Sequence, residues 1–273
     1  MGRTLYLNEN RGMTVFRDGP SIRVEEKTKA GRRIPVRLVG RVIVIGNVRL
    51  DSGAITLFTE NDIPVTFMNR RSEETAVAMP YNHRLPTHYE EQKSLLDSEE
   101  NIYRYKEWAD AKRALLQLNM IRRFLPDLAH KLEKSGFGEG NYQIVLKNIR
   151  RVNDEQWLVV NGIVNNLLRE MIIESVCKAG LDPHLGVIHR RHNFGLVLDI
   201  CYTMGGESDL QSILFFKSYK DKKLIIREKG LWVVTNEGIR NIVHRFENKR
   251  KELRNKIENI IDELFELIRE LRI

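Results

Sequence analysis

The chain has 273 residues, a net charge of +8 and an apolar content of 42%, with only two cysteines. This length can bury the core of one large domain or of two smaller ones. Two cysteines without a CxxC spacing exclude a disulfide framework, and no apolar run approaches the roughly 20 residues that span a bilayer. The start of the chain does not resemble a signal peptide. We therefore expect a soluble cytoplasmic protein with no membrane partner, whose basic surplus is compatible with a polyanionic partner.

The first part of the chain is rich in β-forming residues. Candidate strands are TLYL, MTVFRD, SIRVEE, RIPVRLVGRVIVIGNVRL and IPVTFM, separated by Gly, Pro, Asn and Asp. A short helix is expected over Ile55–Glu60, and Gly46–Asn47 is interpreted as a hairpin or tight turn with a structural role. Residues 1–78 are therefore predicted to form a small β domain.

Helical patterns dominate the rest of the chain. Residues 79–100 are mostly polar, include Pro80 and Pro86, and are predicted to be a linker. Residues 101–273 are predicted to form a larger helical domain that ends in an amphipathic helix, preceded by a short β-like excursion. The predicted fold class is α+β.

The most informative segment for function lies between residues 161 and 199. Its apolar residues recur at intervals of three and four, which predicts a buried helix that Gly180 ends. One apolar run then leads to His189, and a second apolar run, Leu196–Leu198, leads to Asp199. An imidazole and a carboxylate at the ends of neighbouring buried segments indicate a metal site or an acid–base site.

Several strings of the sequence also resemble a known family. GLDPHLGVIH followed by LVLD is similar to the signature of the CRISPR-associated integrase family, adaptation subunit one, which inserts new spacers into CRISPR arrays. MGRTLYLNENRGMTVFRDGPSIRVEE resembles the opening strands of that family, and VIVIGNVRLDSGAITLFTENDIPVTFMNRR resembles its GNV and IPVxF segment. These strings follow the order of the family along most of the chain.

The resemblance implies three metal ligands. The glutamate of the family's GxEG motif falls on Glu139 in GFGEGN, and the histidine falls on His189 in GVIH. The third ligand, an acid three residues after Asp199, falls on Tyr202, which is not a carboxylate. Asp199 matches the acid at the end of the family's following strand and is the first candidate to complete a site for Mn²⁺ or Mg²⁺.

Four further side chains near these positions are weaker candidates. Glu207 and Asp209 follow a Gly–Gly turn and could supply the missing carboxylate, and His184 and His192 are additional imidazoles. Arg190 and Arg191 directly follow His189 and are predicted to contact the DNA backbone, because arginine forks match phosphate geometry. Five further basic clusters, for which a solvated surface is the simpler interpretation, lie at Arg32–Arg33, Arg70–Arg71, Arg122–Arg123, Arg150–Arg151 and Lys249–Lys251.

The resemblance implies a metal-dependent DNA endonuclease and integrase that joins the 3′-hydroxyl ends of a short duplex to the CRISPR repeat. Its partners would be double-stranded and branched DNA, a second copy bound through the β domain, and the second adaptation subunit. The alternative is a DNA-binding scaffold of the same family with a weakened or inactive metal site. Tyr202 is the residue that favours this alternative.

Overall fold

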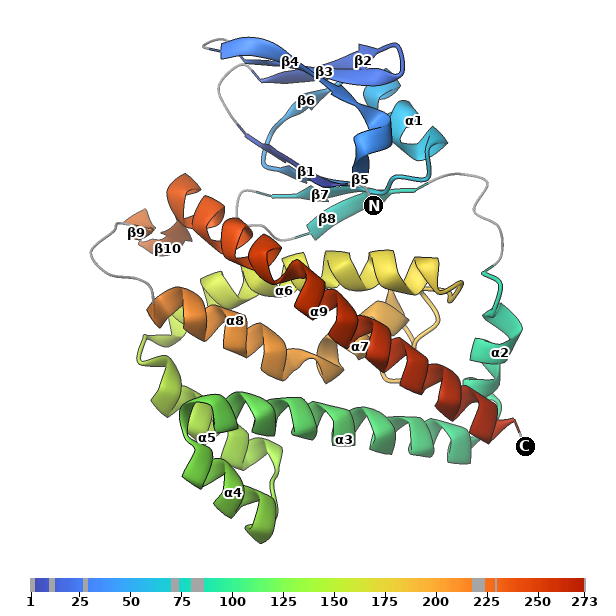
Figure 1. Cartoon of the computed structure of the whole chain (residues 1–273), viewed down its shortest axis with the longest axis vertical. Coiled ribbons are helices and arrows are strands. Elements are labelled where there is room, and N and C mark those ends of the chain that lie inside the picture. Colours follow the sequence, from blue (N-terminus) through green and yellow to red (C-terminus); the bar gives the residue numbers. More distant parts are fainter. Residues whose placement is uncertain are drawn as a thin grey trace. The chain divides into compact units, whose positions relative to one another are not determined.

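The computed structural model describes residues 3–9, 13–26, 29–69, 74–79, 86–217, 224–228 and 230–272. The contacts within the chain divide it into two units, Met1–Arg84 and Leu85–Ile273. Strands dominate the first unit and helices the second (Figure 1). The predicted α+β class, with a β domain followed by a larger helical domain, is confirmed.

The β unit contains two four-stranded sheets. In the first, the order is β1 (Arg3–Asn8), β5 (Val39–Ile45), β7 (Val65–Met68) and β8 (Glu74–Ala78). Its first three strands are parallel and β8 is antiparallel. In the second, the order is β4 (Lys29–Pro35), β3 (Ser21–Glu26), β2 (Thr14–Asp18) and β6 (Arg49–Leu50).

One apolar core joins both sheets to α1 (Ser52–Glu60), the helix that was expected from Ile55. Every second residue of the strands points into it, as the two-residue period of a strand requires. Its fully buried members include Leu7, Val15, Ile22, Val42, Val44, Phe58 and Val65. The Asp51 side chain caps α1 by accepting a hydrogen bond of 2.6 Å from the Ala54 amide.

The chain passes between the sheets at Gly46 and Asn47. Gly46 has φ of +77°, a backbone conformation that favours glycine, and the Asn47 amide donates to the Glu9 carboxylate at 3.1 Å. The following strand, β6, pairs with β2 in the other sheet. Gly46–Asn47 is therefore a tight turn that changes sheets rather than a hairpin.

The helical unit is built from eight α-helices and one hairpin among its described residues. The helices are α2 (Tyr89–Lys93), α3 (Glu99–Phe124), α4 (Pro126–Ser135), α5 (Glu139–Arg150), α6 (Asp154–Lys178), α7 (Gly195–Thr203), α8 (Gly205–Lys217) and α9 (Asn236–Leu271). The hairpin of β9 (Ile225–Glu228) and β10 (Leu231–Val234) corresponds to the expected β-like excursion.

The boundary between the units falls within the predicted linker. Pro80 lies outside the described residues, but the segment from Pro86 onward belongs to the helical unit. The side-chain amide of Gln92 in α2 donates to the carbonyls of Asp182 and Leu185, at 2.9 and 2.7 Å. These bonds attach α2 to the loop that follows α6.

The segment from residue 161 to 199 folds as predicted in its first part and differently in its second. The apolar face of α6 is buried, and Gly180 with φ of +70° follows the helix end. The run Leu196–Leu198, however, is the first turn of α7 and not a strand. An apolar run this short fits both elements, and here Gly195 allows the helix to start against the preceding loop.

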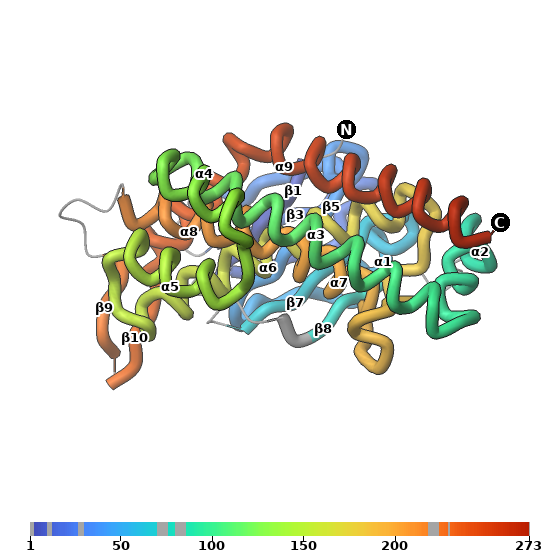
Figure 2. The backbone as a smooth tube through the Cα atoms, turned by 90° about the horizontal axis from the view of Figure 1, so that it is seen from below, coloured from blue at the N-terminus to red at the C-terminus, as the bar shows by residue number. Residues whose placement is uncertain are grey.

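Two long helices cover the helical unit. The ion pairs Arg104–Glu270 and Lys112–Glu263 join the first part of α3 to the last turns of α9, and Figures 1 and 2 show the two helices approaching each other near the carboxy-terminus. The apolar stripe predicted for the carboxy-terminal helix is mostly buried in α9. Within the described part of the chain, no helix is long and apolar enough to cross a bilayer.

Candidate functional site

Asp199 anchors the loop that carries His189. Its carboxylate is fully buried and accepts backbone hydrogen bonds from Val187, Ile188 and His189 at 2.7, 3.1 and 2.9 Å. It also bonds to Nδ1 of the His189 ring at 2.8 Å. Four donors thus satisfy both carboxylate oxygens, so that Asp199 holds a tight loop against the first turn of α7.

Two glycines make this close arrangement possible. A Cβ on Gly186 would lie 2.3 Å from the carbonyl carbon of Gly195, and a Cβ on Gly195 would lie 2.7 Å from the carbonyl oxygen of His189. Larger residues would push the loop away from α7. The glycines therefore bring the amides of residues 187–189 within reach of Asp199.

The contact with Asp199 determines how His189 can act. An ionised carboxylate only accepts hydrogen bonds, so Nδ1 of His189 carries a proton, and in the neutral ring the lone pair is on Nε2. The His189 side chain is 31% exposed, and the ring of His192 lies edge-on at 5.8 Å. His189 is thus an oriented imidazole that is accessible to a ligand, a metal ion or a proton.

Glu139, the first residue of α5, lies in a separate cluster of hydrogen bonds. Arg113 of α3 binds it with a two-pronged contact, in which Nε and Nη2 donate to the two carboxylate oxygens at 3.1 Å each. The amides of Gln117 and Gln143 also donate, at 2.9 and 2.6 Å. Burial raises the pKa of Glu139, but the hydrogen bonds from these three residues outweigh it and lower the pKa to about 2.

Tyr202 lies beside the same arginine. The Arg113 guanidinium stacks on the Tyr202 ring at 4.4 Å, and its Nη1 donates to the Tyr202 carbonyl at 2.6 Å. The Tyr202 hydroxyl donates to Asp110 at 2.7 Å. Burial and this hydrogen bond raise the pKa of Tyr202 to about 12, so its hydroxyl is neutral at ordinary pH.

Glu207 and Asp209, the alternative carboxylates, have partners of their own. Glu207 is buried and pairs with Lys256 of α9 at 2.6 Å. Asp209 accepts hydrogen bonds from the Tyr142 hydroxyl at 2.6 Å and from Asn161 at 3.1 Å. Both carboxylates thus connect helices of the unit through bonds to other side chains.

The side chains present do not fit the divalent ion that the sequence resemblance implies. Among the described residues, no three His, Cys, Asp or Glu side chains are grouped so that they could hold a metal ion. Both oxygens of Asp199 accept hydrogen bonds from loop amides and from His189, so its role as a ligand stays a prediction. Glu139 is bound by an arginine, and the third position is a neutral tyrosine.

The predicted phosphate contacts Arg190 and Arg191 are both exposed, and neither has a hydrogen-bond or ion-pair partner within the described ranges. His184, in contrast, is part of the loop framework, because its Nδ1 accepts from the Phe194 amide at 3.1 Å. His192 is exposed next to His189. One turn of the chain thus presents two free guanidinium groups beside an oriented imidazole.

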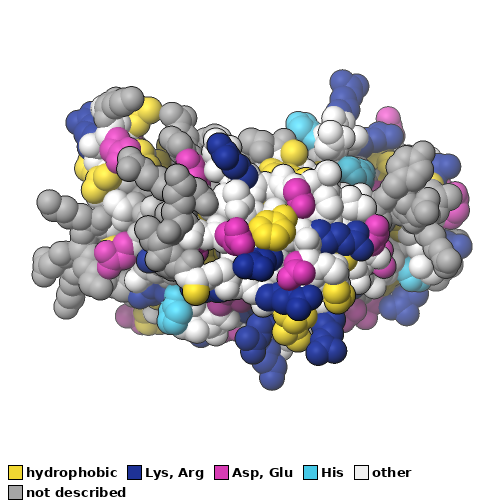
Figure 3. Space-filling model, turned by 90° about the horizontal axis from the view of Figure 1, so that it is seen from above, with side chains coloured by type: hydrophobic (Ala, Val, Ile, Leu, Met, Phe, Trp, Pro, Cys, Tyr) yellow, Lys and Arg dark blue, Asp and Glu magenta, His cyan; other side chains and the backbone are white. Residues whose placement is uncertain are grey.

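Other basic clusters are partly neutralised. Four of them contain an ion pair, namely Arg33–Asp18, Arg122–Glu133, Arg150–Asp154 and Arg250–Glu174. Arg70 and Arg71 lie outside the described residues. The face shown in Figure 3 likewise has basic and acidic side chains interspersed. Arg190 and Arg191 therefore remain the strongest candidates for contact with an anionic partner.

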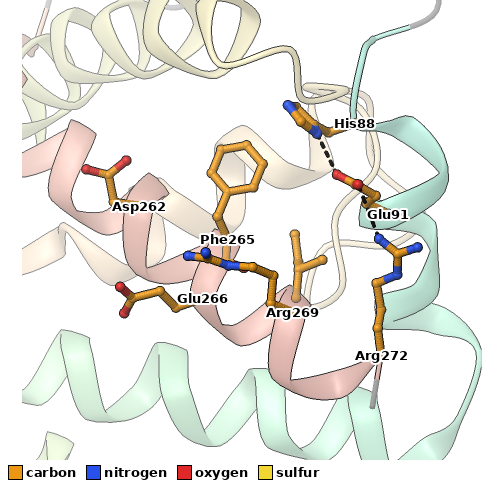
Figure 4. Close-up of a pocket in the computed structure, with 8 residues that line it drawn as sticks. His88, Glu91, Asp262, Phe265, Glu266, Arg269 and Arg272 are labelled. Atoms are coloured by element: carbon orange, nitrogen blue, oxygen red, sulfur yellow. Dashed lines mark hydrogen bonds and ion pairs between the residues drawn. The ribbon is translucent and has the colours of Figure 1, made fainter.

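A cavity of about 620 Å³ lies between α2 and the end of α9 (Figure 4). Its lining includes Phe265, Arg269 and the ion-paired Glu91 and Arg272, which are 3.2 Å apart. None of the predicted site residues lines it.

Arg113 was not among the residues singled out from the sequence, although it organises the cluster around Glu139. The segment ADAKRALLQLNMIRRFL was interpreted only as an amphipathic helix. The available signal was a basic residue and an amide, Arg113 and Gln117, one turn apart on a largely apolar helix face.

Comparisons with known proteins agree with this fold. Residues 5–155 match the model of the family described as CRISPR associated protein Cas1. A CAS1 protein from Thermotoga maritima has a TM-score of 0.77 at 19% identity, over 98% of this chain and 97% of that chain. A casposase bound to integration product has a TM-score of 0.70 at 18% identity, over 91% of this chain and 82% of its own.

A chain of a Cas6-RT-Cas1–Cas2 complex is also similar, with a TM-score of 0.75 at 13% identity, over 98% of this chain and 35% of that chain. No curated protein matches the sequence. At these identities the solved structures show a shared fold, whereas the family model covers more than half of the chain.

Proposed function

Because this chain belongs to the Cas1 family of CRISPR-associated proteins, we propose that it binds DNA during the insertion of new spacers into a CRISPR array. The observation that carries the proposal is the exposed pair Arg190–Arg191, which is unpaired among the described residues and adjoins the oriented His189. Guanidinium groups in such a position can bind the phosphates of a duplex or branched DNA. The net charge of +8 favours the same partner.

Within this role, the geometry favours a protein that holds DNA over a fully active integrase. The carboxylate that the resemblance assigns to the metal is bound by Arg113, and Tyr202 stands where an acid is expected. We therefore propose that the chain acts mainly as a DNA-binding scaffold of the integration complex. A second copy, bound through the β domain, and the second adaptation subunit are the proposed protein partners, supported by the likeness to a chain of a Cas1–Cas2 complex.

One observation favours the second candidate function, a Mn²⁺- or Mg²⁺-dependent integrase and endonuclease. His189 is held in a single tautomer by a buried carboxylate, and this arrangement is typical of histidines that bind metals or act in acid–base catalysis. The likeness in fold to a casposase bound to integration product supports the same candidate. In this case His189 and Glu139 would hold the ion, after Glu139 is released from Arg113.

An assay of strand transfer and of cleavage on branched DNA separates the two candidates. The wild-type protein is tested with Mn²⁺ and with Mg²⁺, beside His189→Ala and the control His192→Ala, which removes the neighbouring exposed imidazole. For the scaffold we expect DNA binding without metal-dependent turnover in any of the three proteins. Turnover that disappears in His189→Ala and persists in His192→Ala would establish the integrase, and failure to bind any duplex or branched DNA would refute both.

A further inference from the structure

Arg113 occupies the centre of the cluster that contains Glu139 and Tyr202. Each of its guanidinium nitrogens has a partner: Nε and Nη2 donate to the Glu139 carboxylate, and Nη1 donates to the Tyr202 carbonyl. The face of the guanidinium lies against the Tyr202 ring at 4.4 Å. The side chain of Arg113 is only 18% exposed, while that of Glu139 is 50% exposed.

The surroundings of Arg113 are shaped to fit it. Gly205 begins α8 next to the guanidinium, and a Cβ at that position would lie 2.7 Å from Nη1. The adjacent Gly206 brings α8 against the backbone of α3, where a Cβ would lie 2.8 Å from the Gln117 amide nitrogen. Arg113, a residue of α3, is therefore enclosed by α5, α7 and α8 and is not a mobile surface residue.

We propose that Arg113 is a built-in cation that takes the place of a divalent metal ion in this site and keeps such an ion from binding at Glu139. This proposal rests on the proposed DNA-binding role, in which the site needs positive charge but no metal-dependent step. Arg113 supplies that charge permanently, because a guanidinium is protonated at every pH at which the protein is folded.

The charges around the cluster explain why a metal ion is excluded. A divalent ion at Glu139 would have to break the two-pronged ion pair and would leave a largely buried guanidinium without its carboxylate. It would also place two further positive charges beside Arg113. Tyr202 contributes no negative charge in compensation, because its hydroxyl is neutral and donates to Asp110.

The test measures binding of Mn²⁺ to the protein without DNA, by calorimetry and by the electron paramagnetic resonance of the free ion. Four proteins are compared: wild type, Tyr202→Glu, Arg113→Met, and the double variant Arg113→Met with Tyr202→Glu. We expect no saturable Mn²⁺ binding by the wild type or by Tyr202→Glu. The double variant, which has two carboxylates and no arginine, is expected to bind Mn²⁺ saturably and at least about tenfold more tightly than Arg113→Met.

Two controls identify the site. Adding His189→Ala to the double variant should weaken the new Mn²⁺ binding by about tenfold or more if the imidazole is a ligand. Arg122→Met together with Tyr202→Glu removes another ion-paired arginine of α3, the partner of Glu133, and should create no binding. Circular dichroism and thermal unfolding of each variant establish that it is folded.

Two outcomes would overturn the proposal. One is saturable Mn²⁺ binding by the wild type that His189→Ala or Glu139→Gln removes. The other is binding by Tyr202→Glu alone as tight as that of the double variant, because the missing acid, and not the arginine, would then be what excludes the ion. The first outcome can be observed even if Arg113→Met does not fold, and saturable Mn²⁺ binding by Tyr202→Glu alone would then overturn the proposal. Neither result depends on whether the protein binds DNA.

Discussion

At the scale of single residues, Asp199 has a role that its position in the sequence did not reveal. The sequence motif predicts an acid near His189, and in the structure Asp199 is hydrogen-bonded to Nδ1 of the His189 ring. The same carboxylate also accepts hydrogen bonds from three backbone amides. These bonds require the close approach of the backbone at Gly186 and Gly195. The proximity of His189 and Asp199 could thus be predicted, whereas the backbone hydrogen bonds that Asp199 accepts depend on tertiary structure.

Replacing Asp199 tests this anchoring role. Asp199→Asn turns one acceptor oxygen into a donor, so at least one loop amide loses its hydrogen bond inside the protein. We expect the free energy of unfolding in urea to fall by roughly 2–4 kcal/mol. The control Asp110→Asn changes a partner of Tyr202 outside the loop and should cost less than about 1 kcal/mol.

The nitrogen NMR signals of the His189 ring give a second readout. They should report one tautomer in the wild type and a mixture in Asp199→Asn, because Nδ1 loses its fixed acceptor. Unchanged stability together with an unchanged tautomer would show that Asp199 does not orient the imidazole.

Asp209 makes stability depend on pH. Burial raises its pKa from 3.8 to about 6, although hydrogen bonds from Tyr142 and Asn161 and the charge of Arg113 act in the opposite direction. The folded state therefore binds this proton more tightly than the unfolded state. The resulting stabilisation is complete below about pH 3.8 and is lost as the pH rises through about 6.

We expect Asp209→Asn to flatten this part of the pH profile. In the wild type, this carboxyl should lower the free energy of unfolding by roughly 2–2.5 kcal/mol between pH 4 and pH 7, and an amide does not titrate. Glu139 has a lowered pKa of about 2, so its contribution is lost only as the pH falls from about 4.5 towards 2. Denaturation curves of wild type and variant that change in parallel with pH would contradict the assignment to Asp209.

At the scale of helices and strands, periodicity predicted the long elements and failed for the short one that matters most. The apolar faces of α6 and α9 are buried as their spacing indicates. The three-residue run before Asp199 was too short to distinguish a strand from the first turn of α7. The ion pair between Arg113 and Glu139 joins residues on different helices, and helix packing of this kind leaves no periodic signal in the sequence.

The contact between α8 and α3 can be tested with two glycines. A Cβ at Gly206 would lie 2.8–3.0 Å from the backbone of Leu116 and Gln117, so Gly206→Ala must separate the helices. We expect a loss of about 1–3 kcal/mol in the free energy of unfolding. Gly162 in α6 is the matched control, because a Cβ there meets no atom within 4 Å.

Gly162→Ala should therefore stabilise the protein by about 0.5–1 kcal/mol through higher helix propensity. Chemical denaturation of both variants measures the difference. Equal effects of the two substitutions would contradict the close approach of α8 to α3.

At the scale of the whole molecule, the net charge of +8 did not by itself locate a binding surface. Ion pairs neutralise part of most basic clusters, so the useful distinction is between paired and free arginines. The order of the two units could be predicted from composition, because the density of β-branched residues and turn residues falls after residue 78. The ion pairs between helices could not be predicted from the sequence, because they depend on how the helices pack.

The salt dependence of DNA binding tests the surface at Arg190 and Arg191. Each neutralised phosphate lowers log K by about 0.9 per decade of salt. The double variant Arg190→Ala with Arg191→Ala should therefore reduce this slope by about one to two units, measured by fluorescence anisotropy on a duplex. Arg122→Ala with Arg123→Ala removes the same charge elsewhere and should leave the slope close to that of the wild type.

The candidate site residues belong to two separate hydrogen-bond networks, and this separation determines which substitutions the protein can accept in evolution. The His189 imidazole is held by its loop and by hydrogen bonds to Asp199. Glu139, Arg113 and Tyr202 are joined to one another by a separate set of hydrogen bonds. A lineage can therefore exchange residues in the second network while the first remains intact. Laboratory selection can likewise change the residue at position 202 while the hydrogen bonds of the His189 loop stay in place.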